Sequence, residues 1–254
     1  MRVNFGRTAS DYARHRAGFP EALFDRLVQN GMVAAGQRLL DLGTGTGSLA
    51  RGFARRGLLV TGLDPARPLL DQARRLDAAA GVAVEYLLAR AESTGLPDAS
   101  FDVVSAGQCW HWFERARAAQ EVRRLLRPGG RVVIAHFDWL PLAGNVVEAT
   151  ERLIRQHNPD WTHGGGTGLH PAWLADLALA GFTRLETFSF DHAIDYSHAA
   201  WRGRIRASAG IAASLDAAAV ARFDAAHEAL LARDFPDQPL RVPHRCWAAI
   251  GVNP

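Results

Sequence analysis

The chain of 254 residues has no lysine, so all 29 of its basic side chains are arginine. Without lysine it cannot contain the phosphate-binding loop that ends in Lys-Ser or Lys-Thr. We attribute this absence to genome composition rather than to function. Only two cysteines occur, Cys109 and Cys246, and their distance in sequence argues against a disulfide framework and a paired-cysteine metal site.

Long hydrophobic runs are also lacking. No apolar run approaches the length of a membrane span, and the first residues, MRVNFGRTASDYARHR, lack the apolar core of a signal peptide. There is no Gly-x-Ser-x-Gly nucleophile elbow, and no two histidines have metal-ligand spacing with a cysteine or a carboxylate. We therefore expect a cytoplasmic protein with no membrane partner and no metal.

A strong charge of one sign is absent as well. The net charge is +3, with +5 in residues 1–127 and −2 in residues 128–254. The arginines are interleaved with acids and form no basic tract. This pattern favours a mixed solvated surface over a surface that binds nucleic acid.

What the first half does contain is an alternation of apolar runs and helical patterns. The expected strands are 38–43, 58–64, 83–89, 101–107 and 131–137. The expected helices are 46–56, 68–80 and 113–126, and RPGG at 127–130 should end the last of these. Five strands joined by helical crossovers predict an α/β fold with a parallel sheet covered on both faces.

The second half has a different pattern. Helices are expected at 146–157, in a segment ending near Ala180, at 197–209 and at 216–233, and strands at 184–190 and 242–252. Helices placed between the last two strands would lie above the sheet edge, where a substrate cap belongs. We predict a single domain over 1–254, with a core at about 34–137 and cap insertions at about 138–180 and 191–241.

A glycine-rich loop follows the first expected strand, in LLDLGTGTGSLA at 39–50. Its glycines are Gly43, Gly45 and Gly47. The dinucleotide-binding fingerprint needs its third glycine three places after the second, and Ser48 occupies that place. The loop therefore departs from the pattern of a pyrophosphate site.

Asp41 is more informative than the glycines, because its side chain is expected beside the ligand at the carboxyl end of the strand. A carboxylate there would repel a pyrophosphate and would favour a cation, such as an ammonium or a sulfonium. The alternative is that Asp41 only caps the following turn. We favour the ligand role because Thr44 or Thr46 could cap the helix.

Asp64 ends the second expected strand, 21 residues after Gly43. An acid at this place accepts hydrogen bonds from ribose hydroxyls in nucleotide-binding α/β folds. Asp64 could also be the N-cap of the next helix, with Pro65 at the first helical position, and the two roles are compatible. The loop and Asp64 together predict an adenosine-type ligand.

These motifs resemble those of the class I S-adenosylmethionine (SAM) methyltransferases, over at least residues 10–137. LLDLGTGTG resembles the first motif, GLDP the second, RAESTGLPDASFDVV the adenine-binding segment and LLRPGGRVVI the start of the fifth strand. ASDYARHRAGFP is similar to an N-terminal element in relatives of trans-aconitate methyltransferase. The resemblance implies a Rossmann-like sheet of seven strands, mostly parallel with an antiparallel last strand, with helices on both faces and a helical cap.

By this resemblance the cofactor is SAM. The residues expected around it are Tyr12, Arg16, Asp41, Gly43, Thr44, Gly45, Gly47, Asp64, Ala91, Glu92 and Gln108. Arg90 departs from the family, because many members have an acid there that accepts from the adenine amino group, and arginine cannot accept. Glu92, a backbone carbonyl or a water could take that role, and the backbone of Ala91 could contact the ring.

The candidates for acceptor contact lie at strand ends. Methyl transfer requires alignment and exclusion of water, and it requires a base only when the acceptor carries a proton at neutral pH. In QCWHWF, His111 is the candidate base and Trp110 a candidate substrate contact, unless this cluster packs the next helix. His136, after the fifth strand, is a further candidate substrate contact, with a loop or capping role as its alternative.

The expected cap has two distinctive segments. Arg202 and Arg206 share one helix face, and forked guanidinium groups bind carboxylates and phosphates, so the pair predicts an anionic substrate. The alternatives are a solvated face or ion pairs with Asp191 and Asp195. The segment HGGGTG at 163–168 is either a mobile flap over the site or a plain flexible loop.

The sequence thus predicts a SAM-dependent methyltransferase that acts on a small-molecule acceptor. O-methylation of an anionic or hydroxyl-bearing metabolite is favoured. The alternatives are a SAM-binding protein without turnover, an NAD(P)-dependent oxidoreductase and a nucleic-acid methyltransferase.

Overall fold

The computed structural model describes residues 18–254. Within this range the chain forms two compact units. A sheet unit contains 18–137, 169–190 and 246–254, and a helical unit contains 138–168 and 191–245. The change of unit at residue 138 coincides with the expected start of the cap insertions, whereas 169–180 belongs to the sheet unit.

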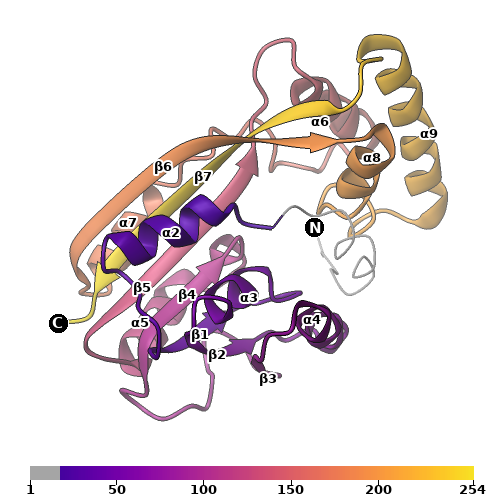
Figure 1. The fold of residues 1–254 in the computed structure, drawn as a ribbon. Helices are drawn as coiled ribbons and strands as arrows, with labels where there is room; N and C mark the ends of the chain where they lie inside the picture. Colours follow the sequence, from indigo (N-terminus) through magenta and orange to yellow (C-terminus); the bar gives the residue numbers. More distant parts are fainter. Residues whose placement is uncertain (1–17) are drawn as a thin grey trace. The chain divides into compact units, whose positions relative to one another are not determined.

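Seven strands form one sheet in the order β3-β2-β1-β4-β5-β7-β6 (Figure 1). Their bounds are β1 Arg38–Leu42, β2 Leu59–Leu63, β3 Glu85–Leu87, β4 Phe101–Gly107, β5 Leu126–Trp139, β6 Thr183–Tyr196 and β7 Leu240–Val252. Strands β1 to β5 pair in parallel with one another, and the last strand, β7, is antiparallel. The predicted fold class is confirmed.

Helices cover the faces of the sheet unit. They are α2 Glu21–Gln29, α3 Ser48–Ala54, α4 Arg67–Ala80, α5 Arg115–Leu125 and α7 Ala172–Leu179. Successive side chains of a strand point to opposite faces. Leu40 and Leu42 are fully buried in the main core with residues of α5 and α7. Asp41, between them, therefore points to the opposite face of β1.

The segment RPGG does not end α5 in the expected way. The helix ends at Leu125, and Leu126 is already extended, with φ −78° and ψ 138°. Proline disfavours helical backbone in the residue before it, so Arg127 continues the extended conformation. Strand β5 therefore starts at Leu126, five residues before the expected strand, and Leu126 pairs with Phe101 of β4.

The helical unit contains α6 Val146–His157, α8 His198–Arg206 and α9 Ala217–Asp234, close to their expected positions. Each begins after a capping side chain: Asn145, Ser197 and Asp216 accept hydrogen bonds from the amide three residues ahead. The three helices share a second core with Trp161 and Tyr196. No described helix has both the length and the apolar character needed to cross a membrane.

Two buried histidines affect the stability of the helical unit. His227 and His244 are 0% and 2% exposed, and burial lowers the pKa of each imidazole to about 4. His227 Nε2 lies 3.2 Å from Thr150 Oγ1, while its Nδ1 has no hydrogen-bond partner within residues 18–254. Burial disfavours a proton on either ring, although Nδ1 of His244 lies 3.0 Å from the carbonyl of Val242.

We expect the free energy of unfolding to fall as the pH decreases from about 6.5 to 4, because unfolded histidine binds a proton that the folded rings exclude. At pH 4.5 the loss is about 2.5 kcal/mol per ring. Urea unfolding at pH 7 and pH 4.5 measures how much free energy of unfolding is lost on acidification. In His227→Phe this loss should be about 2.5 kcal/mol smaller than in the wild type, because the variant lacks one of the two rings. An equal loss in both proteins would contradict the buried neutral state of His227.

Candidate cofactor and acceptor site

The glycine loop joins β1 to α3. Its three glycines have positive φ, 58° at Gly43, 56° at Gly45 and 76° at Gly47, a backbone region that glycine adopts most readily. Apart from Gly45 itself and its two chain neighbours, no atom of residues 18–254 lies within 4 Å of the position that a Cβ would take at Gly45. At Gly47 a Cβ would lie 2.3 Å from the hydroxyl of Tyr86. The loop is therefore open at Gly45 and tightly packed at Gly47.

Asp41 is only 1% exposed. Its two carboxylate oxygens accept hydrogen bonds from Thr44 Oγ1 and Ser105 Oγ, each at 2.7 Å. Burial raises the pKa of this carboxyl to about 6. The expectation that Thr44 or Thr46 caps α3 is wrong, because the N-cap is Gly47 and no side chain within 18–254 caps it. Asp41 thus connects the turn after β1, through Thr44, to β4, through Ser105. When it is ionised, its charge lies in an interior of low dielectric constant.

Asp64 connects the end of β2 to the glycine loop. It is 7% exposed, and it accepts hydrogen bonds from the amide of Gly45 at 3.0 Å and the amide of Ala66 at 2.8 Å. Helix α4 begins at Arg67 with Ala66 as its N-cap and a proline in its first turn. The alternative of Asp64 as N-cap, with Pro65 first in the helix, is therefore wrong.

The expected adenine segment is fixed to the start of α5. Ala91 is 3% exposed. Glu92 Oε1 accepts a hydrogen bond from the amide of Glu114 at 3.0 Å, and its other oxygen lies 3.8 Å from Arg90 Nε. One oxygen of Glu92 is therefore already engaged within the protein. Its contact with an adenine amino group stays a prediction.

The residues after β4 separate into buried and exposed side chains. Gln108 has φ 57°, and its Nε2 donates to the carbonyl of Phe137 at 2.7 Å. Trp110 is fully buried and its Nε1 donates to Asp176 at 3.0 Å, so it packs α7 and has no surface for a substrate. His111 is exposed, and Trp112 is 39% exposed. Trp110 also shares its core cluster with residues of α5, the next helix, as the alternative of helix packing expected.

His111 belongs to an aromatic cluster of the sheet unit. Its ring centroid lies 5.3 Å from that of His136, which is 3% exposed, and the ring of His136 lies 4.4 Å from that of His170. His170 stacks on Trp173 at 3.9 Å. Sequence reasoning did not identify His170 or Trp173, because only the fold brings them to β5.

Arg202 and Arg206 are paired within the helical unit. Arg202 binds both oxygens of Asp224, at 3.2 and 2.5 Å, and also binds Glu228. Arg206 Nη1 donates to Asp224 at 2.7 Å. The alternative of ion pairs is therefore favoured, although the expected partner Asp191 pairs with a different arginine. We do not include the two arginines in the proposed acceptor site.

The loop at 161–168 is anchored by side chains of the helical unit. Glu151 is 2% exposed, and it accepts hydrogen bonds from the amide of Gly165 at 2.7 Å and from Trp139 Nε1 at 2.8 Å. Arg245 donates to the carbonyl of Thr167 at 3.0 Å. These contacts favour an ordered loop over a freely flexible one.

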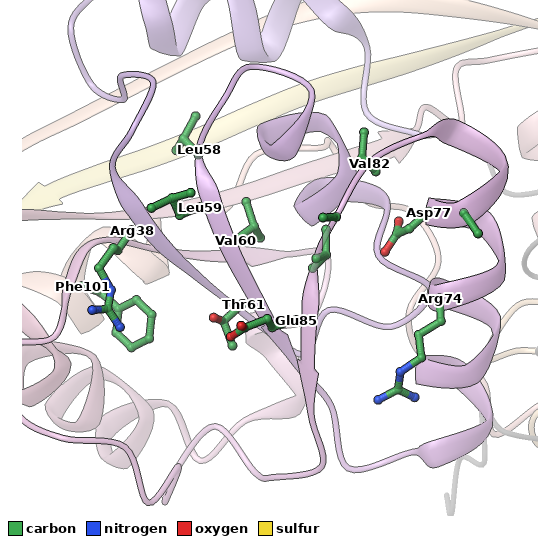
Figure 2. A pocket seen from close by; sticks show the side chains of 13 residues that line it. Arg38, Leu58, Leu59, Val60, Thr61, Arg74, Asp77, Val82, Glu85 and Phe101 are labelled. Atoms are coloured by element: carbon green, nitrogen blue, oxygen red, sulfur yellow. The ribbon is translucent and has the colours of Figure 1, made fainter.

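A cavity of about 620 Å³ lies at the amino ends of β1 to β4, whereas the glycine loop follows the carboxyl end of β1. Figure 2 shows the side chains that line this cavity. Arg38, Leu59, Glu85 and Phe101, which line it, are the first residues of β1, β2, β3 and β4. Open α/β sheets bind their ligands at the carboxyl ends of the strands. We therefore do not assign the cofactor to this cavity.

The chain matches known methyltransferases over most of its length. A family model of the methyltransferase domain matches residues 40–134. An uncharacterised methyltransferase of Mycobacterium tuberculosis is 42% identical over 199 residues, which are 71% of this chain and 77% of that protein. The malonyl-[acyl-carrier protein] O-methyltransferase of Serratia marcescens is 36% identical over 132 residues, 52% of this chain and 50% of that protein.

A solved structure has the same fold. Phosphoethanolamine N-methyltransferase 2 of Haemonchus contortus, in complex with SAM, is 20% identical with a TM-score of 0.57, over 98% of this chain and 56% of that chain. The fold and the family match define a transferase of the class I type. The chain belongs to the SAM-dependent methyltransferases, and SAM is its cofactor.

The residues present fit this cofactor. The open space at Gly45 would allow a ligand to approach the backbone, and the buried carboxyl of Asp41 would complement a cation. Asp64 lies at the end of β2, next to that space. Tyr12 and Arg16 lie outside the described residues, so their contact with SAM stays a prediction.

Proposed function

We propose that the enzyme transfers the methyl group of SAM to an oxygen atom of a small molecule, an anionic or hydroxyl-bearing metabolite of the cytoplasm. The main support for the proposal is His111, which is exposed and lies four residues after the end of β4. Its ring is in contact with the rings of His136 and Trp112. Imidazole is the side chain best suited to accept a proton near neutral pH. The name of the Serratia relative, an O-methyltransferase, supports oxygen as the acceptor atom.

Each group has a distinct role in this proposal. SAM supplies a methyl group activated by its sulfonium. The backbone at 43–47 receives the methionine part, with Asp41 as a buried counter-charge, and Asp64 accepts hydrogen bonds from the ribose. His111 takes the proton of an alcohol or phenol acceptor, whereas a carboxylate acceptor needs no base.

The test is transfer of a radioactive methyl group from SAM to a panel of acceptors. The panel contains small carboxylic acids, phenols, alcohols, amines and a structured RNA. We expect label in one or more oxygen acceptors and none in RNA. Methyl esters release labelled methanol in base and methyl ethers do not, so hydrolysis separates the two oxygen products. Label only in amines or RNA would contradict the proposal.

The role of His111 is tested on the acceptor that the panel identifies. With an alcohol or phenol, His111→Asn should lower kcat at least about tenfold and remove the dependence of kcat on pH. The exposed His192, on β6, provides the control variant His192→Asn, which should leave kcat unchanged. With a carboxylate acceptor, His111→Asn should change kcat little. A loss of equal size in both variants would exclude His111 as the base.

A further inference from the structure

The guanidinium group of Arg51, on the second turn of α3, binds the end of the glycine loop. Its Nη2 donates to the carbonyl of Thr46 at 2.8 Å, and its Nη1 donates to the carbonyl of Gly47 at 3.2 Å. The amide of Arg51 donates to the carbonyl of Gly47 as well, at 2.8 Å. One side chain therefore fixes the orientation of two successive peptide planes of the loop.

Asp77, on α4, holds this guanidinium in place. Asp77 Oδ1 lies 2.9 Å from Arg51 Nε, and Asp77 Oδ2 accepts a hydrogen bond from the hydroxyl of Tyr86 at 2.7 Å. The side chains of Arg51 and Asp77 are 13% and 5% exposed. Figure 2 shows Asp77 directed from α4 towards the strands. Arg51 Nε and Asp77 Oδ1 form no hydrogen bond with each other within the described residues, so this contact is a close ion pair, and an ion pair buried to this degree stabilises a fold little by itself.

Tyr86, on the edge strand β3, completes the arrangement. A Cβ at Gly47 would lie 2.3 Å from its hydroxyl, and a Cβ at Gly62 would lie 2.8 Å from its ring. The tyrosine thus occupies the space that glycine leaves at both positions. Three elements, α3, α4 and β3, therefore meet at Gly47 through charged or polar side chains.

We propose that Arg51, Asp77 and Tyr86 are positioning residues that hold the glycine loop in the conformation that receives SAM. The inference rests on the proposed role of this loop in cofactor binding. Arg51 acts through the backbone, because it binds the carbonyls of Thr46 and Gly47 and so sets the directions of the amides that follow them. Asp77 pairs with Arg51, and Tyr86 binds Asp77 and fills the space beside Gly47.

Arg56 provides a matched control on the same segment. Its side chain is 16% exposed, its Nη1 donates to the carbonyl of Gly52 at 3.2 Å, and its Nη2 pairs with Glu21 and Asp25 of α2. It resembles Arg51 in burial and in bond types, but its contacts do not include the loop. If Arg51 only stabilised the fold, substitution of Arg51 and substitution of Arg56 should change ligand binding to the same extent.

The experiment measures binding of S-adenosylhomocysteine by calorimetry, and deuterium exchange of the amides of residues 44–48 without ligand. Arg51→Gln should weaken binding about tenfold and accelerate this exchange, and Tyr86→Phe should weaken binding about threefold. Arg51→Lys, which keeps the charge, should regain part of the affinity. Arg56→Gln should lower the melting temperature but leave binding and loop exchange unchanged.

Unchanged binding in Arg51→Gln, or equal weakening in Arg56→Gln, would overturn the inference. If Arg51→Gln does not fold, unchanged binding and exchange in both Tyr86→Phe and Arg51→Lys would overturn it. Asp64→Ala separates this inference from the role of the loop itself. If Asp64→Ala binds S-adenosylhomocysteine normally, the role of the loop in cofactor binding is refuted. If Asp64→Ala binds weakly but the Arg51 and Tyr86 variants bind normally, only the positioning role is refuted.

Discussion

Replacing Asp64 with alanine is expected to weaken the binding of SAM and S-adenosylhomocysteine about a thousandfold. In the structure, Asp64 accepts hydrogen bonds from the amides of Gly45 and Ala66. In the complex, we expect it also to accept hydrogen bonds from the ribose hydroxyls. Bonds to an ionised carboxylate contribute about 1.5–3 kcal/mol each, so loss of the loop bond together with the ribose bonds accounts for the expected effect.

Two control variants distinguish this role from general destabilisation. Asp64→Asn keeps an oxygen acceptor without the charge and should lose only about tenfold to a hundredfold in affinity. Asp102 accepts a hydrogen bond from the amide of Arg38, at the other end of β1, at 2.8 Å. Asp102→Ala should therefore lower the melting temperature and leave the dissociation constant unchanged, both measured with S-adenosylhomocysteine. A full-affinity Asp64→Ala protein would remove Asp64 from the site.

Many of the helices and strands of both units could be predicted from the sequence, because their signals are local. β4 lies at the expected 101–107, and α6 lies at the expected 146–157, directly after a capping asparagine. Apolar runs followed by glycine or aspartate mark the carboxyl ends of parallel strands, where ligands bind. β5 starts earlier than expected because Leu126 pairs with Phe101 of β4 and the backbones of Gly129 and Gly130 hydrogen-bond to Asn253, across residues that local propensity treats as breakers.

The side-chain partners could not be predicted, because they come from different elements. Ser105 binds Asp41 because the parallel register of β1 and β4 places the two residues side by side. Arg202 pairs with Asp224, 22 residues away, through the packing of α8 on α9. Trp110 looked like a surface candidate beside His111, and only the position of α7 places it in the core. Contacts of this kind depend on tertiary packing rather than on sequence spacing.

Asp41 combines a structural role with a charge, and the two roles predict effects of opposite sign in Asp41→Asn. Its pKa of about 6 in the folded protein lies above the 3.8 of an unperturbed carboxyl, mainly because of burial. The protonated form is therefore favoured in the fold, and its contribution to stability is lost as the pH rises through 6. At pH 7 the ionised carboxylate costs about 3 kcal/mol, a cost that asparagine avoids.

We therefore expect Asp41→Asn to have a higher melting temperature than the wild type at pH 7 but to bind SAM about a hundredfold more weakly, because the cation of SAM loses its buried counter-charge. Differential scanning fluorimetry and calorimetry measure the two effects on the same sample. As a control, Ser105→Ala removes one hydrogen bond to Asp41 but keeps the charge, and it should weaken binding far less. An Asp41→Asn protein that is less stable than the wild type and binds SAM with the same affinity would contradict the role of the charge.

The same carboxyl predicts how SAM binding depends on pH. A bound cation favours ionised Asp41, so affinity should rise as the pH rises through 6 and should be about tenfold lower at pH 5 than at pH 7. At pH 5 to 6 binding should release up to one proton, which calorimetry in two buffers of different ionisation enthalpy would detect. Both effects should disappear in Asp41→Asn. S-adenosylhomocysteine, which lacks the sulfonium but keeps the ammonium, then identifies the responsible charge: an equal pH dependence assigns it to the ammonium, and a weaker one to the sulfonium.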